Sequence, residues 1–280
     1  MRWLQWVHGD LYRILCTRNL RIALILPAVA CVLRIFWSKG SAHWEEARRI
    51  AQGLKVAASA GNGFGPMADG LRTGGAVLSL VALVVGAMIW VRERESGVQM
   101  LVLLDRRRVL VVLSRAAALS VLVLLSMALM LGGAAASSAI AYDLKSLVED
   151  GFEMATATEL WTDTLKAALA AMPGLLGSAC FGLLVSVLTS SSGAAVAGTL
   201  IPFVLFDLLQ GLLGDSARFV FVRYVPFLGE HSTLARLTDV ARAYSDAGWE
   251  ENELLMATAV PALELLVVLL IACLWSRRRE

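Results

Sequence analysis

Residues 75–97 read GAVLSLVALVVGAMIWV-RERESG, an apolar run that ends abruptly in alternating charges. Residues 105–108 read DRRR, and a second apolar run occupies Val109–Ile140. Each run is long enough to cross a bilayer as a helix, for which about 20 apolar residues suffice. The charged segment between the runs does not belong in lipid. The sequence therefore predicts two membrane-spanning helices joined by a charged loop at the membrane surface.

The same pattern extends along the chain. Hydrophobic residues make up 58% of the 280 residues, whereas soluble domains contain about 45–50%. We therefore expect an all-α, polytopic membrane protein with six transmembrane helices. The expected spans are Leu20–Phe36, Gly75–Val91, Ala116–Ile140, Leu165–Leu188, Ala194–Leu213 and Met256–Trp275.

Arginines mark one side of this predicted bundle. They precede the first span, occupy the segment between the second and third spans, and follow the sixth span as Arg277, Arg278 and Arg279. Six spans place these three regions on one side of the membrane, and short arginine-rich segments stay in the cytoplasm. Both termini are therefore expected to be cytoplasmic.

The segments outside the spans give a second set of expectations. Residues 1–19 carry tryptophans and leucines at helical spacing, which predicts an amphipathic helix in the inner membrane interface; a cytoplasmic helix packed on a partner is the alternative. Outer loops are expected at 38–73, 141–164 and 214–255, and the first of them is expected to contain a short helix from Trp44 to Ala57. We expect the glycine-rich residues 61–66 to be a flexible connector. The last loop is apolar and aromatic at 219–228, which favours re-entrant or interfacial outer helices before the sixth span.

The residue types that carry enzyme chemistry do not converge in this sequence. The three histidines are scattered over both sides of the predicted membrane, so a shared metal is not expected. No Gly-x-x-x-x-Gly-Lys-Ser/Thr motif is present, so we expect neither nucleotide hydrolysis nor a bound cofactor on this chain. Nothing in the sequence indicates a nucleic-acid partner.

Three ionisable residues lie inside the predicted spans, where a charge is costly and is usually paired or functional. They are Arg34, Asp207 and Glu264, all in the predicted outer half of the bilayer. One interpretation is structural, with Arg34 paired to a carboxylate or extended to the outer surface. The other is a proton relay or a contact with a transported substrate.

The inner segment at 92–108 has the features of a docking element. Residues Glu93 to Leu104 are compatible with a short helix parallel to the membrane, with an apolar side toward lipid and arginines at its borders. Such a helix fits a groove on a cytoplasmic protein. The alternative is a loop whose arginines contact anionic lipid.

The order of residues in this segment resembles the inner loop of type-2 ABC exporter permeases, the ABC-2 type. Arg92-Glu93-x-Glu95-x-Gly97 is followed by Leu103-Leu104 and then by Arg108, as in that family. Val98 stands where the family has threonine, and no proline occurs between Leu104 and Arg108. The interfacial first helix, the six spans and the tight turn at 189–193 also match the family's plan.

The resemblance implies a function and a set of partners. Residues 20–280 would form the permease domain of a bacterial inner-membrane exporter, which pairs with a second permease copy and contacts membrane lipid. Two cytoplasmic ABC ATPases would bind ATP and Mg²⁺ and dock on the loop at 92–108. The coupling residues would then be Glu93, Glu95, Gly97, Leu103 and Arg108. Substrate would move along a path formed mainly by the second and fifth spans of the two copies.

Two other functions are compatible with the same spans. A secondary transporter would use Asp207 and Glu264 for proton coupling and would need no ATPase. A membrane scaffold of an envelope machine, such as a pilus or a motility apparatus, would share the fold without moving a substrate.

Overall fold

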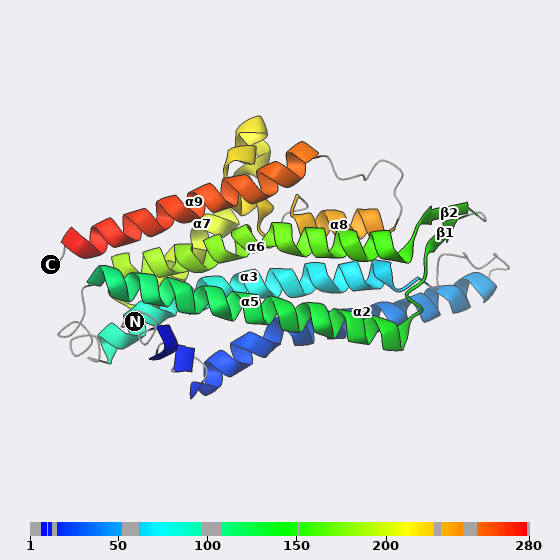
Figure 1. The fold of residues 1–280 in the computed structure, drawn as a ribbon, viewed down its shortest axis with the longest axis horizontal. Coiled ribbons are helices and arrows are strands. Elements are labelled where there is room, and N and C mark those ends of the chain that lie inside the picture. Colours follow the sequence, from blue (N-terminus) through cyan, green and yellow to red (C-terminus); the bar gives the residue numbers. More distant parts are fainter. Residues whose placement is uncertain are drawn as a thin grey trace.

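The computed structural model describes residues 7–9, 11–12, 16–51, 62–96, 108–149, 152–226, 231–242 and 251–278. Its long helices lie side by side in an elongated bundle, with the start of α2 and the end of α9 toward the same end (Figure 1). The long helices are α2 (Arg18–Ala51), α3 (Phe64–Glu95), α5 (Arg108–Ala141), α6 (Ala157–Leu188), α7 (Ser192–Leu213) and α9 (Glu251–Arg278).

Five helices of the described chain are long and apolar enough to cross a membrane, so the protein is a multi-pass membrane protein. Their candidate spans are Arg18–Ser41, Phe64–Glu95, Val109–Ala141, Ala157–Leu188 and Asn252–Arg277. These correspond to five of the six predicted spans. The other predicted span, Ala194–Leu213, lies in α7, whose apolar stretch Ser192–Phe206 is shorter than in the other helices. A sixth span therefore stays a prediction.

The helices continue beyond the predicted spans, which shortens the first outer loop. The sequence predicts a loop at 38–73 with a short helix at Trp44–Ala57. Residues up to Ala51 are helical as part of α2 rather than as a separate helix, and α3 already begins at Phe64. The flexible connector expected at 61–66 is wrong for its described residues. The Gly63 backbone N–H donates a 3.0 Å hydrogen bond to the carbonyl of Asp143. Phe64 is only 1% exposed and packs edge-on against Trp161 of α6. Burial of this aromatic ring fixes the start of α3 in the core.

The segment between α5 and α6 contains a small hairpin that the sequence did not predict. Strands β1 (Leu147–Glu149) and β2 (Phe152–Ala155) pair antiparallel, with Val148 opposite Glu153. Helix α6 begins directly afterwards, earlier than its predicted span. Thr156 and Glu159 form a capping box there, in which each side chain satisfies a backbone N–H of the other residue.

Short helices occupy the segment between α7 and α9, where the sequence predicts re-entrant or interfacial outer helices. They are η2 (Gly214–Phe219), η3 (Phe221–Tyr224) and α8 (Thr233–Ala241). Leu234 and Leu237 of α8 are buried against the bundle, and α8 contacts α3 and α6. The hydroxyl of Thr233 donates a 3.1 Å hydrogen bond to the carbonyl of Ala167 in α6. These helices pack onto the membrane helices as an integral part of the fold.

Helices α3 and α6 form the centre of the bundle and approach each other closely at two glycines. A Cβ atom added at Gly86 would lie 2.4 Å from the carbonyl oxygen of Ala179, and one added at Gly182 would lie 2.4 Å from that of Leu83. Small residues permit such close backbone packing between membrane helices. The outer helices α2 and α9 instead expose many large apolar side chains, as expected for surfaces that face lipid.

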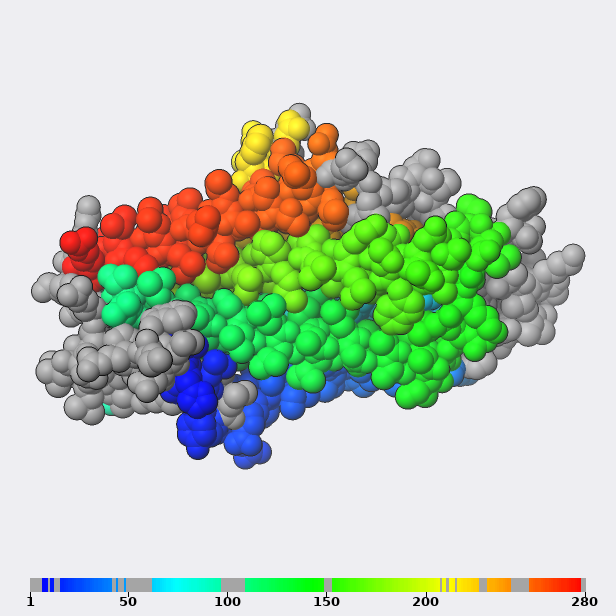
Figure 2. All heavy atoms as spheres, viewed as in Figure 1, coloured from blue at the N-terminus to red at the C-terminus, as the bar shows by residue number. Residues whose placement is uncertain are grey.

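The space-filling view shows one continuous face made by α5 and α6, with α9 along its edge (Figure 2). The predicted interfacial helix at 1–19 lies largely outside the described residues. Of its residues, 7–9 and 11–12 are helical. Leu11 packs against Ala118 and Leu122 of α5, so this part of the segment contacts the bundle.

Candidate functional site

The alternating charges after residue 91 form the last turn of α3. Helix α3 continues to Glu95, and the Ser96 N–H donates a 2.9 Å hydrogen bond to the carbonyl of Arg92. The sequence places the start of a separate surface helix at Glu93, and this start is wrong. Glu93 and Glu95 are instead carried by a membrane-spanning helix, which fixes their positions relative to the bundle.

Glu93 forms an ion pair with Arg115 of α5. The Arg115 side chain is only 2% exposed, and its guanidinium lies 4.6 Å from the centre of the Trp90 ring. A buried arginine is costly without a counter-charge, and the face of an indole ring adds a favourable cation–π contact. The pair therefore fixes the end of α3 against the start of α5.

The next two charged residues of α3, Arg94 and Glu95, contact the segment between α6 and α7. Arg94 donates a 2.6 Å hydrogen bond to the carbonyl of Thr189, in the turn after α6. Glu95 accepts a 2.9 Å hydrogen bond from the backbone N–H of Ser192, the first residue of α7. A carboxylate at a helix N-terminus is stabilised by the unpaired N–H groups and by the helix dipole. The α3 end is thus joined to the α6–α7 turn.

We call this set of contacts the inner clamp, made of Glu93, Arg94, Glu95, Arg115, Thr189 and Ser192. Three consecutive residues of α3 bind α5, the turn after α6 and the start of α7. A displacement of the α3 end would therefore be transmitted to three further elements. The inner clamp is therefore the candidate functional site in the described part of the chain.

The structure describes only some of the five predicted coupling residues. Glu93 and Glu95 belong to the inner clamp and contact other parts of the same chain. Gly97 and Leu103 lie outside the described residues, and Arg108 is described only as the first residue of α5. The inner-clamp members that were not among the predicted site residues are Arg94, Arg115, Thr189 and Ser192.

A groove between α2 and α3 leads to the inner clamp. Its volume is about 610 Å³, and most of its lining is apolar, including Leu26, Val84 and Met88. At one end the lining becomes polar, with Arg92, Glu93 and Arg115. The groove thus combines an apolar wall with charged groups near the end of α3.

The structure does not show the three charged residues predicted inside the spans together in one site. Glu264 of α9 accepts a 3.0 Å hydrogen bond from the backbone N–H of Phe221, which fixes η3 to α9. Arg34 is exposed on α2 and has no ion-pair partner among the described side chains. The side chain of Asp207 lies outside the described residues. Among the described residues, Glu264 therefore contacts a short helix rather than Arg34.

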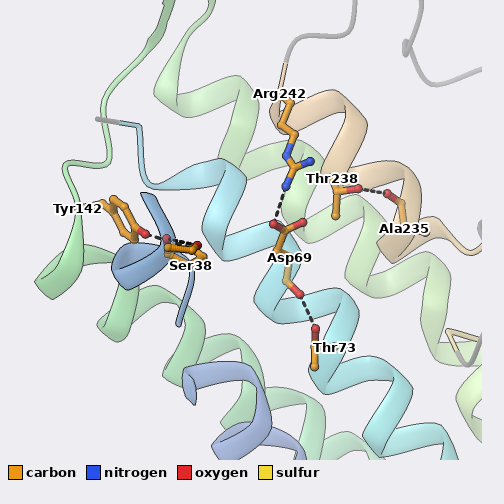
Figure 3. A network of polar contacts seen from close by, with 8 residues as sticks. Ser38, Asp69, Thr73, Tyr142, Ala235, Thr238 and Arg242 are labelled. Atoms are coloured by element: carbon orange, nitrogen blue, oxygen red, sulfur yellow. Dashed lines mark hydrogen bonds and ion pairs between the residues drawn. The ribbon is translucent and has the colours of Figure 1, made fainter. Parts of the chain in front are cut away.

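Polar contacts also connect the helices at the opposite end of the bundle (Figure 3). Arg242, just after α8, forms a 2.6 Å ion pair with Asp69 of α3. The hydroxyls of Ser38 in α2 and Tyr142 at the end of α5 are 3.0 Å apart. The Tyr142 phenol is protonated at neutral pH and can donate in this contact, and partial burial raises its pKa further. These contacts fix α8 to α3 and α5 to α2.

Among the described residues, no three His, Cys, Asp or Glu side chains lie together in a group that could hold a metal ion. No protein-family model matches the chain, and a comparison with curated proteins gives no significant match. The function is therefore inferred from the membrane fold and from the inner clamp.

Proposed function

We propose that this protein is the permease subunit of an ABC exporter of the ABC-2 type, driven by separate cytoplasmic ATPases. The observation that carries the proposal is the inner clamp. Residues 97–107 connect α3 to α5, and Glu93 joins the two helices where they enter that segment. An ATPase that binds this segment would therefore pull on two membrane helices that are already joined.

The inner clamp also provides the route from this segment to the rest of the bundle. Arg94 and Glu95 extend the connection to the turn at Thr189 and to the start of α7. Movement driven by ATP would thus reach α3, α5, α6 and α7 together. Such coupling needs a contiguous set of contacts that both sites can bias, and the inner clamp is such a set.

The proposal assigns different tasks to the five coupling residues. Gly97, Leu103 and Arg108 would contact the ATPase, because they belong to or border the segment between α3 and α5. Glu93 and Glu95 would mainly hold that segment in place through their contacts with Arg115 and Ser192. The exposed Arg92 beside them would add charge-assisted contacts with the partner.

The remaining features of the proposal follow the resemblance. The chain would cross the bacterial inner membrane six times, with α7 as the fifth span and both termini in the cytoplasm. It would pair with a second permease copy, and ATP and Mg²⁺ would bind the ATPase partner. The exposed apolar faces of α2 and α9 supply surface for lipid and for such a copy.

Purification of the tagged chain in a mild detergent tests this function. We expect a stoichiometric partner with a nucleotide-binding motif, identified by mass spectrometry, and ATP hydrolysis by the complex. The variant Glu95→Arg should reduce the partner or its coupled hydrolysis while the chain stays inserted. Glu153→Arg, an exposed position of β2 at the opposite end, serves as the matched control. A stable chain that repeatedly purifies without an ATPase would contradict the proposal and favour a scaffold or a proton-coupled transporter.

A further inference from the structure

A second cavity lies away from the inner clamp, where η2, η3, α8 and the start of α9 meet. Its volume is about 520 Å³. Arg218 of η2, Arg223 of η3, Arg236 of α8 and Glu253 of α9 all contribute to its wall. Figure 1 shows α8 and the start of α9 at some distance from the end of the bundle where α9 finishes. The cavity therefore belongs to the outer part of the proposed permease.

The charges around this cavity are predominantly positive. Three arginines and one glutamate are among its described lining residues. Glu253 forms an ion pair with Arg236 and so balances one of the arginines. Arg223 is partly buried and has no ion-pair partner among the described residues. A partly buried cation in a concave site favours an anion, because the surrounding protein screens the charge less than bulk water does.

The start of α9 forms another part of the wall. Asn252, Glu253 and Leu254, in the first turn of this long helix, line the cavity. The same turn begins with Glu251, and carboxylates in a first turn offset the partial positive charge of the unpaired N–H groups. The positive potential of the cavity therefore comes from the arginines rather than from the helix end.

The wall of the cavity is held in shape by internal contacts. The hydroxyl of Tyr224 donates a 2.8 Å hydrogen bond to the carbonyl of Arg218, which joins η2 to η3. Glu264 fixes the start of η3 to α9, and Thr233 fixes the start of α8 to α6. Arginines carried on such a fixed wall lose little additional freedom when an anion binds.

From these features, we infer that the cavity binds the phosphate group of an anionic ligand at the outer face of the membrane. Arginine suits this group because its planar guanidinium can donate two parallel hydrogen bonds to phosphate oxygens. The cavity is large enough for a phosphate together with the group it esterifies, since small-molecule sites have volumes of about 300–1,000 Å³. The candidate span of α9 begins at Asn252, so the cavity adjoins the depth at which lipid phosphates lie. The inference does not depend on an ATPase partner.

Binding to the purified full-length chain in a neutral detergent tests this site. The probes are dioctanoyl phosphatidylglycerol, the zwitterionic dioctanoyl phosphatidylcholine, and glycerol 1-phosphate, with bound molecules counted by native mass spectrometry. We expect phosphatidylglycerol to bind more tightly than phosphatidylcholine. Arg223→Gln should weaken this binding by about tenfold, the effect of losing one charge-assisted contact. Arg48→Gln, which removes an exposed arginine of α2 outside the cavity lining, should leave it unchanged.

A variant that is expected to increase the affinity distinguishes a specific effect on the anion site from a general loss of structure. Glu253→Gln removes the one acidic side chain among the described lining residues, so it should tighten phosphatidylglycerol binding. Tight binding of glycerol 1-phosphate would identify the phosphate group as sufficient, whereas binding of phosphatidylglycerol alone would identify a lipid headgroup as the source. Equal affinity in the Arg223→Gln and Arg48→Gln variants would overturn the inference. Weaker binding by Glu253→Gln, or no binding of either anionic probe, would also overturn it.

Discussion

The carboxylate of Glu95 accepts a 2.9 Å hydrogen bond from the backbone N–H of Ser192, a residue 97 positions later in the sequence. This contact joins the end of α3 to the start of α7, next to the segment proposed to bind an ATPase. Glu95 therefore has a structural role inside the chain in addition to any contact with a partner. Its neighbour Glu93 has a similar role toward α5.

The contact of Glu95 should contribute to the stability of the bundle. Glu95→Ala removes both the acceptor and the negative charge at the α7 N-terminus, and we expect a loss of about 1 kcal/mol in the free energy of unfolding. Glu95→Gln keeps an acceptor and should lose less. Unfolding of the purified variants in detergent measures both changes. Glu153→Ala, at an exposed position of β2, is the control, and equal stability of the Glu95→Ala and Glu153→Ala variants would contradict the assigned contact.

The ion pair between Glu93 and Arg115 should appear in a double-mutant cycle. Glu93→Gln or Arg115→Met leaves one charge without its partner beside the core, and each should cost about 3 kcal/mol of unfolding free energy. The double variant should cost clearly less than the sum of the single variants, because no unpaired charge remains. Additive losses would show that the two side chains do not interact.

The close crossing of α3 and α6 should tolerate no side chain at Gly86. A methyl group there meets backbone atoms of α6, which cannot move aside as a flexible side chain can. Gly86→Ala should therefore destabilise the protein by about 1–3 kcal/mol, the usual cost of overpacking.

Gly132 of α5 provides the matched control for this prediction. A Cβ atom added there has no heavy atom within 4 Å, so Gly132→Ala should be neutral or slightly stabilising through its better helix propensity. The same thermal shift for both alanine variants would contradict the packing of α3 on α6.

The ion pair between Asp69 and Arg242 should hold α8 on α3. Its side chains are 14% and 48% exposed, so Asp69→Asn should cost about 0.5–1 kcal/mol. Hydrogen–deuterium exchange of the amides in Thr233–Ala241 should then become faster. Lys145→Ala, which breaks the fully exposed pair with Asp143, should not change exchange in α8. Unchanged exchange in the Asp69→Asn variant would assign the attachment of α8 to its apolar face alone.

The sequence predicted the membrane helices from local features. Long apolar runs identify spans because the bilayer demands about 20 apolar residues in succession. The sequence predicted a short helix from Trp44 but not its continuity with the first span, since residues 38–43 carry no apolar run that distinguishes a helix from a loop. The hairpin at Leu147–Ala155 was missed for a similar reason, because its strands are short and contain acidic residues.

The inner clamp was predicted only in part. The pattern of charges singled out Glu93 and Glu95, but their partners depend on the packing of distant segments. Arg115 lies in a long apolar run, and this isolated charge signals that it needs a counter-ion. The bare turn at Thr189–Ser192 offered no such signal, because its contribution comes from backbone groups that every residue possesses.

Site-specific cross-linking tests the central claim most directly. A photoreactive amino acid is placed at Gln99, between α3 and α5, and for comparison at Glu153 in β2. After illumination in native membranes, cross-linked chains are purified and identified by mass spectrometry. The proposed function predicts a cross-link from position 99 to a nucleotide-binding ATPase, and none from position 153. Efficient insertion of the chain with no ATPase cross-linked at position 99 would contradict it.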